Sequence, residues 1–425
     1  MNFENCISAL NGKTKEERLS ALLEIKKKID LGEIRQSKCE GIANNHIHTT
    51  FSFSPYSPTA AAFMAWKAGL EVCGIIDHDS VSGCREFVEA SKIIGISATC
   101  GLECRVRTDG TKLYGRMINN SEQRSVAYVV MHAIPLGSLG FVDSIFKPLR
   151  EKRNERNVKM CARLNDFLDI FGIFIDYEKD VLPLSLYSEG GTVTERHICL
   201  ALVQKLKEKL KSSIEIISFL VEKLNVPISK LEEKRILEED PFCYDYDILS
   251  VIKKHLVDKF YVDAYEECIH IKDFVSLAKN LGCISAYAYL GDVIDTSDMD
   301  KKTQKYEDAY LELLMAELKK LDFDAITYMP SRNTRYQLSK VMELCKKHDF
   351  FEINGEDINS PRQGFCSLFD DSMFSHLTDM NYALIGHEAA VTRSIENSMF
   401  SEKIKCKYPK IKERIEYYKG IAAEK

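Results

Sequence analysis

Short apolar segments alternate with amphipathic ones along most of this chain, and that alternation constrains the fold more than any other feature. Amphipathic stretches that begin with helix-capping residues, such as Ser57-Pro58, separate several of the apolar runs. Strands that alternate with helices predict parallel β/α units, whose functional groups gather at the carboxyl ends of the strands. The sequence therefore predicts an α/β fold with its site at one end of the sheet. The expected strands are 72–76, 96–106, 126–131, 283–289, 324–328, 351–354 and 382–385.

Composition is that of a globular protein and excludes some classes. The 425 residues are 45% hydrophobic and 29% charged, and no apolar run approaches the ~20 residues that a membrane helix needs. A net charge of −6 gives no overall attraction to nucleic acid or anionic membrane, so any phosphate recognition must be local. The 14 cysteines form no C-x-x-C pair, and the first residues lack a basic and apolar leader, which together predict reduced thiols in the cytoplasm.

Two histidines near the first strand carry the strongest chemical signal. His46 and His48 are two residues apart, so on an extended backbone their rings point to the same side. Imidazole is a common metal ligand, and a carboxylate could complete the set. Taken singly, each polar strand-end residue has a plain structural explanation, such as a helix cap or a hydrogen-bonded core histidine. Together they supply enough ligands for two divalent ions. These residues are His46, His48, Asp77, His78, Glu103, His132, Asp357 and His387.

The spacing of these residues resembles the PHP family, the polymerase and histidinol phosphatase superfamily. The resemblance covers roughly residues 40–140 and 280–390. It implies a distorted (β/α)7 TIM-like barrel and a metal-dependent phosphoesterase. The motifs that carry it are His46-x-His48, the turn Asp77-His78-Asp79, Gly-x-Glu at Glu103, the strand-end His132 and Gly355-Glu356-Asp357.

The resemblance implies a metal centre with fewer ions than the three that some members hold. One ion would be held by His46, His48, Glu103 and Asp357, and a weaker neighbour by Glu103 and His132. We therefore expect one or two divalent ions per chain, as Zn, Mn or Fe. Asp77 is predicted to orient the ligands.

A third metal site is expected to be lost. Phe53 and Asn359 stand where the family usually has Asp and His, and a phenyl ring cannot ligate a divalent ion. Phe53 is predicted to form an apolar wall, which leaves His78 to act as an acid, a base or a hydrogen-bond donor. His197 or His387 could replace lost ligands, and the sequence places neither ring.

Between the two matched regions the chain changes to long charged helices. Insertions into such barrels enter between β/α units and cover the site, so we expect this block to cap the open end. The predicted segments are an N-terminal helical segment (1–40), the first part of the barrel (41–141), a helical insertion (142–281), the second part of the barrel (282–395) and a C-terminal helix (396–425).

Arginines follow several expected barrel strands, where a guanidinium could bind phosphate oxygens bidentately. Surface ion pairs are the alternative for each of them. Arg332 and Arg362 are predicted to bind substrate.

These observations favour a cytoplasmic metal-dependent hydrolase of a phosphomonoester or phosphodiester. The expected partner is a small phosphorylated substrate, with no membrane, and with nucleic acid only as a short oligonucleotide substrate. Two alternatives stay open. The loss of metal ligands is consistent with a degenerate barrel that binds a small molecule or acts as a regulatory module without turnover. A His-x-His barrel is also consistent with a metal-dependent amidohydrolase-type enzyme. The retained Glu103 and Asp357 favour an enzyme.

Overall fold

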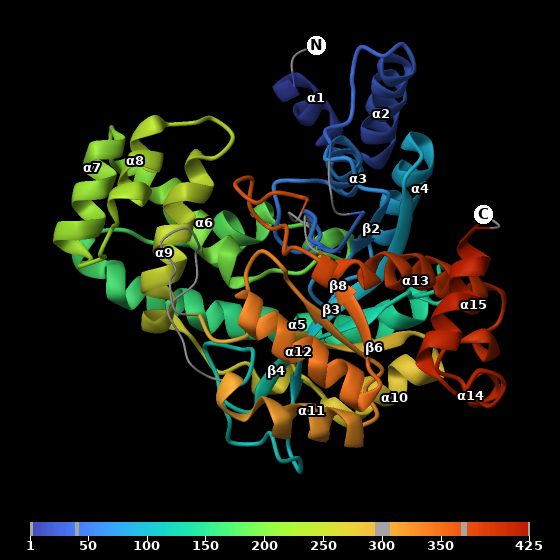
Figure 1. The fold of residues 1–425 in the computed structure, drawn as a ribbon. Coiled ribbons are helices and arrows are strands. Elements are labelled where there is room, and N and C mark those ends of the chain that lie inside the picture. Colours follow the sequence, from blue (N-terminus) through green and yellow to red (C-terminus); the bar gives the residue numbers. More distant parts are fainter. Residues whose placement is uncertain (1–2, 39–41, 294–306, 367–371, 424–425) are drawn as a thin grey trace.

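A nearly closed barrel forms the centre of the molecule (Figure 1). The computed structural model describes residues 3–38, 42–293, 307–366 and 372–423. Seven strands pair in the order β1-β2-β3-β4-β6-β7-β8, and the short β5 pairs with β3. This arrangement confirms the predicted α/β class and TIM-like barrel. The strands are β1 (Ala43–Ile47), β2 (Val72–Ile75), β3 (Ser97–Arg107), β4 (Val126–His132), β5 (Ile269–His270), β6 (Ile284–Tyr289), β7 (Ala325–Tyr328) and β8 (Phe351–Asn354).

Strand β4 runs against its neighbours, which corrects the expectation of uniformly parallel units. It pairs antiparallel with both β3 and β6. The segment that joins β3 to β4, residues 108–125, contains no helix, and a parallel pair would need such a crossover. The carboxyl end of β4 therefore lies beside Ile284, the first residue of β6.

Side-chain amides close the barrel between β8 and β1. Asn45 donates from Nδ2 to the carbonyl of Asn354 over 3.1 Å. Just beyond β8, the amide of Ile358 donates to the carbonyl of His46 over 3.2 Å. Gly355 permits this approach, since a Cβ there would lie 2.6 Å from the Cβ of His46. The segment that follows β8 is thereby held against the strand that carries the two histidines.

Helices pack against the outside of the strands around a shared apolar core. Helix α12 begins after Thr334, whose hydroxyl accepts from the backbone amide of Gln337 and caps the helix. At the N-terminus, a two-bond ion pair between Arg18 of α2 and Glu86 of α4 docks the first helices on the barrel. These helices are α1 (Phe3–Leu10), α2 (Lys15–Asp30), α3 (Pro58–Lys67), α4 (Cys84–Ile94), α10 (Ile271–Asn280), α11 (Leu311–Lys320) and α12 (Arg335–His348).

The strand predicted at 382–385 is instead the middle of α13 (His376–Arg393). Four consecutive apolar residues are ambiguous between a strand and a buried helix, and here the helix buries them. At Gly386 a Cβ would lie 1.8 Å from the carbonyl oxygen of Tyr418, so the missing side chain lets α13 pack closely on α15 (Ile411–Ala423). The short α14 (Glu402–Lys407) connects the two.

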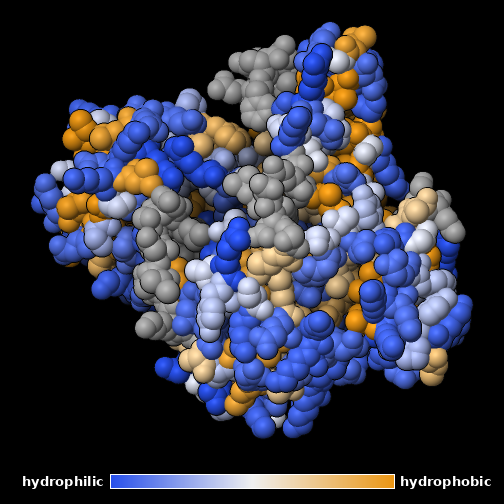
Figure 2. All heavy atoms as spheres, in the orientation of Figure 1, coloured by the Kyte–Doolittle hydropathy of each residue, from blue (hydrophilic) through white to orange (hydrophobic). Residues whose placement is uncertain are grey.

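The helical insertion has an apolar core of its own, formed mainly by residues between 160 and 260. Its helices form a lobe to the left of the barrel in Figure 1. The face of the molecule in Figure 2 is mostly hydrophilic, with hydrophobic side chains scattered over both lobes. The helices are α5 (Leu139–Leu168), α6 (Glu195–Lys209), α7 (Ser213–Ser218), α8 (Lys230–Glu238) and α9 (Tyr244–Phe260).

In the described part of the chain, no helix combines the length and apolar character needed to cross a bilayer. Eleven cysteines in that part are free, and ten of these are buried. Cys366 takes part in a disulfide, so the expectation of reduced thiols does not hold for that residue.

Candidate metal centre

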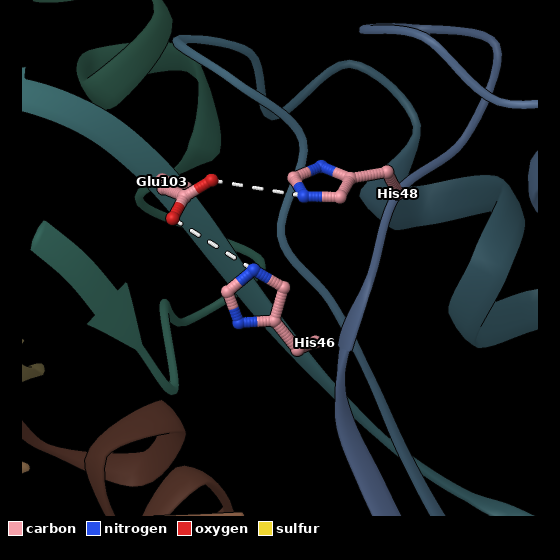
Figure 3. A group of neighbouring side chains, drawn as sticks. All are labelled: His46, His48 and Glu103. Atoms are coloured by element: carbon pink, nitrogen blue, oxygen red, sulfur yellow. Dashed lines mark ion pairs between the residues drawn. The ribbon is translucent and has the colours of Figure 1, made fainter. Parts of the chain in front are cut away.

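His46, His48 and Glu103 converge at one point of the barrel wall (Figure 3). The two imidazoles leave the same stretch of chain on the same side, and Glu103 reaches them from β3. His46 Nε2 lies 3.7 Å from Glu103 Oε1, and His48 Nε2 lies 3.6 Å from Glu103 Oε2. Two atoms that bind one zinc ion in tetrahedral geometry lie about 3.4 Å apart, given bond lengths of about 2.1 Å. The three side chains therefore fit a divalent ion.

Asp357 adds a second carboxylate at the edge of this group. Its Oδ1 lies 3.5 Å from His48 Nε2. The same oxygen accepts a hydrogen bond from the side-chain Nδ2 of Asn359. Asn359 stands where the family usually has a histidine, and here its side chain holds the carboxylate. The four residues predicted to bind the main ion are thus neighbours, although their role as ligands stays a prediction.

His78 lies directly beside Glu103. The parallel register of β2 and β3 continues past Ile75 and Cys100, so His78 comes opposite Glu103. Its Nδ1 is 3.1 Å from Glu103 Oε2, and its ring stacks on His48 with centroids 4.6 Å apart. Burial, aided by His48 and Arg153, holds the pKa of His78 well below its usual value. A neutral imidazole therefore faces the cavity in contact with the group.

His132 lies outside this group of three, and its role as a ligand of a second ion stays a prediction. In the antiparallel ladder it pairs with Gly101, two residues toward the amino end of β3 from Glu103. Burial alone lowers the pKa of His132 to about 3, and the ring does not line the cavity that His46 and Glu103 share. His132 and Glu103 lie on the same face of the sheet, because side chains two residues apart on a strand point the same way. The Nε2 of His132 has no hydrogen-bond partner among the described residues.

Asp77 is buried, and both of its carboxylate oxygens accept hydrogen bonds from the loop that follows β1. Its Oδ1 accepts from the amide of Thr49 and from Ser52 Oγ, both over 2.7 Å, and its Oδ2 accepts from Thr49 Oγ1 over 2.6 Å. Burial raises the pKa of Asp77, against the opposing effect of His48 and these hydrogen bonds. The arrangement suits a group that orients its neighbours, and it leaves Asp77 no contact with the cavity.

Phe53 forms an apolar wall of the cavity, as predicted. It belongs to the core of the insertion, and its ring meets the edge of His197 at 4.9 Å. His197 Nδ1 accepts from the amide of Thr194, and burial lowers its pKa to about 3. His387 contacts Gly282 O through Nε2 and accepts from the amide of Met399. Both rings have structural roles, so neither replaces a lost ligand.

Arg362 is held by the insertion and does not line the cavity, and its role as a substrate ligand stays a prediction. Its Nε and Nη2 donate to the two carboxylate oxygens of Asp247 on α9, over 3.0 and 2.7 Å. This bidentate pair raises the pKa of Arg362 and ties the segment after β8 to the insertion. Arg332, in contrast, lines the cavity as predicted, with its Nε 3.4 Å from Leu290 O.

The insertion also supplies cavity residues that the sequence pattern did not reveal. Arg196 of α6 and Lys253 of α9 line the same cavity as His46, His78 and Glu103. The guanidinium of Arg196 lies over the Phe53 ring, 5.8 Å from its centroid. No sequence motif marks these cations, because α6 and α9 have the composition of ordinary charged helices. Only their packing against the barrel places these two side chains at the cavity. The insertion therefore contributes to the cavity that the candidate ligands line, and its role as a cap over the open end of the barrel stays a prediction.

Comparisons with known proteins agree with this architecture. No family model matches the chain. A candidate metal-dependent phosphoesterase from Bifidobacterium adolescentis superposes with a TM-score of 0.53 at 19% identity, over 81% of this chain and 98% of that one. An amidohydrolase from Chromobacterium violaceum, with bound sulfate and no metal, gives 0.54 at 16% identity, over 80% and 97%. At these identities the likeness shows the fold.

One curated relative matches a short region. It is a 5'-3' exoribonuclease from Haemophilus influenzae, 32% identical over 69 residues. These residues are 16% of this chain and 25% of the relative, so the chain matches only a quarter of that protein's length. The fold and the His-His-Glu group nevertheless agree with the resemblance to the PHP family.

Proposed function

We propose that this protein is a divergent PHP-type hydrolase that cleaves phosphoesters with the help of one or two divalent ions. The observation that carries the proposal is the convergence of His46, His48 and Glu103 at distances suited to one ion, on the wall of a cavity. Such an ion, when bound, supplies Lewis acidity toward a phosphoryl oxygen and lowers the pKa of a water molecule toward neutrality.

Five basic and five acidic side chains line the cavity, and the basic ones support phosphate over an amide. Arg332, Arg196 and Lys253 line it together with the candidate ligands, and such cations suit the oxygens of a phosphate group. The related fold from Chromobacterium violaceum holds sulfate, a tetrahedral dianion like phosphate. We infer a small phosphorylated substrate, which includes a short oligonucleotide, and a cytoplasmic location.

The remaining residues of the centre have distinct roles in this proposal. His78 is neutral and faces the cavity, so it can accept a proton or a hydrogen bond there. Asp77 acts through the residues it holds and not on the substrate. Asn359 keeps the carboxylate of Asp357 near His48.

Amide hydrolysis is the second candidate, because one protein of the same fold is described as an amidohydrolase. A carbonyl substrate would make little use of Arg332 and Arg196, so these arginines discriminate the two reactions. A barrel that only binds a ligand is the third candidate, and any turnover would exclude it.

The deciding experiment compares the natural chain with the double variant H46A/H48A. Metal content is measured after purification without chelator, and hydrolysis is measured on phosphomonoesters, phosphodiesters and amides with added Zn, Mn or Fe. We expect at most two ions per chain and phosphoester cleavage, both lost in the variant while thermal unfolding stays cooperative. Unchanged metal content in the variant would refute the assigned centre, and cleavage of amides alone would refute the assigned reaction.

A further inference from the structure

A buried serine connects Asp77 to His48. Ser52 Oγ lies 2.7 Å from Asp77 Oδ1 and 3.4 Å from His48 Nδ1. All three side chains are almost completely buried, so water does not compete for these hydrogen bonds. The contact reaches the ring nitrogen of His48 that faces away from Glu103.

The protons in this network can be assigned by counting donors. Thr49 Oγ1 accepts from the amide of Phe51, so its own proton goes to Asp77 Oδ2. Ser52 has one proton, which its short contact gives to the Asp77 carboxylate. Toward His48 the serine oxygen then acts only as an acceptor, and the proton between them belongs to the imidazole.

We propose that Ser52 is a positioning residue that transmits the charge of Asp77 to His48 and fixes that ring in the Nδ1–H tautomer. The lone pair of Nε2 is then directed at Glu103 Oε2 and Asp357 Oδ1, at 3.6 and 3.5 Å. A lone pair that faces two carboxylates is unfavourable by itself and favourable with a cation between them. The inference rests on the proposed metal centre, because a cation between Nε2 and the two carboxylates makes this tautomer favourable.

The first test measures affinity for Mn²⁺ and Zn²⁺ in the variant Ser52→Ala. Outer hydrogen-bond partners of metal-binding histidines typically contribute roughly 10- to 100-fold in affinity, and we expect a loss of that size. Ser54→Ala is the matched control, because Ser54 is a buried serine of the same loop whose hydroxyl has no hydrogen-bond partner among the described residues. Equal affinities in the two variants, at similar thermal stability, would overturn the proposal.

The second test reads the tautomer directly in the natural chain loaded with Zn²⁺. Nitrogen-15 NMR distinguishes protonated from unprotonated ring nitrogens, and the His48 signals are those missing from His48→Gln. We expect the proton on Nδ1 at a pH where imidazoles are neutral, and a proton on Nε2 would refute the assignment even if Ser52→Ala fails to fold. If the natural chain bound no divalent ion, the proposed function would fail, whereas an ion bound through Nδ1 of His48 would refute only the role of Ser52.

Discussion

The two walls of the cavity are built in different ways. On the barrel wall, His46 and Glu103 are held by strands whose register fixes where each side chain points. On the opposite wall, Arg196 and Lys253 are held by helices α6 and α9 of the insertion. The positions of the candidate metal ligands therefore follow from the strands that carry them. The positions of the cations that would contact a substrate depend instead on how the insertion packs against the barrel.

Buried ion pairs join the two walls. Arg153 of α5 binds Asp79, the residue after His78, with Nη2 2.9 Å from Oδ2. The same arginine lies 3.1 Å from Glu267, which also pairs with Arg105 of β3 and Arg156 of α5. Charges buried in this way are costly to separate, so the turn that carries His78 is fixed from both sides.

The largest effect is expected at Phe53, which follows β1 in the sequence but packs in the core of the insertion. Phe53→Ala should lower the free energy of unfolding by about 3–5 kcal/mol, because a buried phenyl ring leaves a cavity. Metal stoichiometry should persist, since the candidate ligands lie on the other wall. Phe174→Ala is the control, because that ring is 67% exposed. Chemical denaturation and metal analysis are carried out on both variants. Loss of metal in Phe53→Ala would show that the metal centre depends on the packing of the insertion.

A pH dependence is expected on the barrel side, at Glu307. Burial raises the pKa of this carboxyl from 4.5 to about 7, despite hydrogen bonds from Tyr287 and from the amides of Leu290 and Gly291. Between these pH values the folded chain keeps a proton that the unfolded chain loses, so stability falls as pH rises from 4.5 to 7. The difference corresponds to about 3 kcal/mol.

The variant Glu307→Gln should remove that part of the pH dependence. Urea denaturation at several pH values between 4.5 and 7 measures it, with Glu312→Gln, at an exposed position, as the control. An equally steep loss of stability in Glu307→Gln would assign the dependence to another group.

The smallest effects come from two arginines that look alike in the sequence. Arg332→Gln should raise KM roughly 10- to 100-fold, the equivalent of about 1.5–3 kcal/mol for hydrogen bonds to a charged group, with little change in stability. Arg362→Gln should instead lower the free energy of unfolding by a similar amount, because it loses the pair with Asp247. Steady-state kinetics and denaturation on both variants separate the roles, and a reversed pattern would restore Arg362 as the substrate ligand.

Much of the barrel and of the candidate centre was determined by the sequence itself. His46, His48 and Glu103 could be predicted as neighbours because side chains alternate along a strand and parallel strands end together. Phe53 could be predicted as an apolar wall because a phenyl ring offers no ligand. These inferences need only local periodicity and the chemistry of single side chains.

Only the tertiary structure decided the direction of β4, the helical state of 382–385 and the partner of Arg362. The direction of β4 is set by the short connection from β3 and not by the apolar pattern of either strand. Arg362 and Arg332 differ because Asp247, 115 residues from Arg362 in sequence, reaches only one of them. Contacts between segments far apart in the chain produce no periodic pattern in the sequence of either segment. Such contacts place the cations of the insertion opposite the histidines.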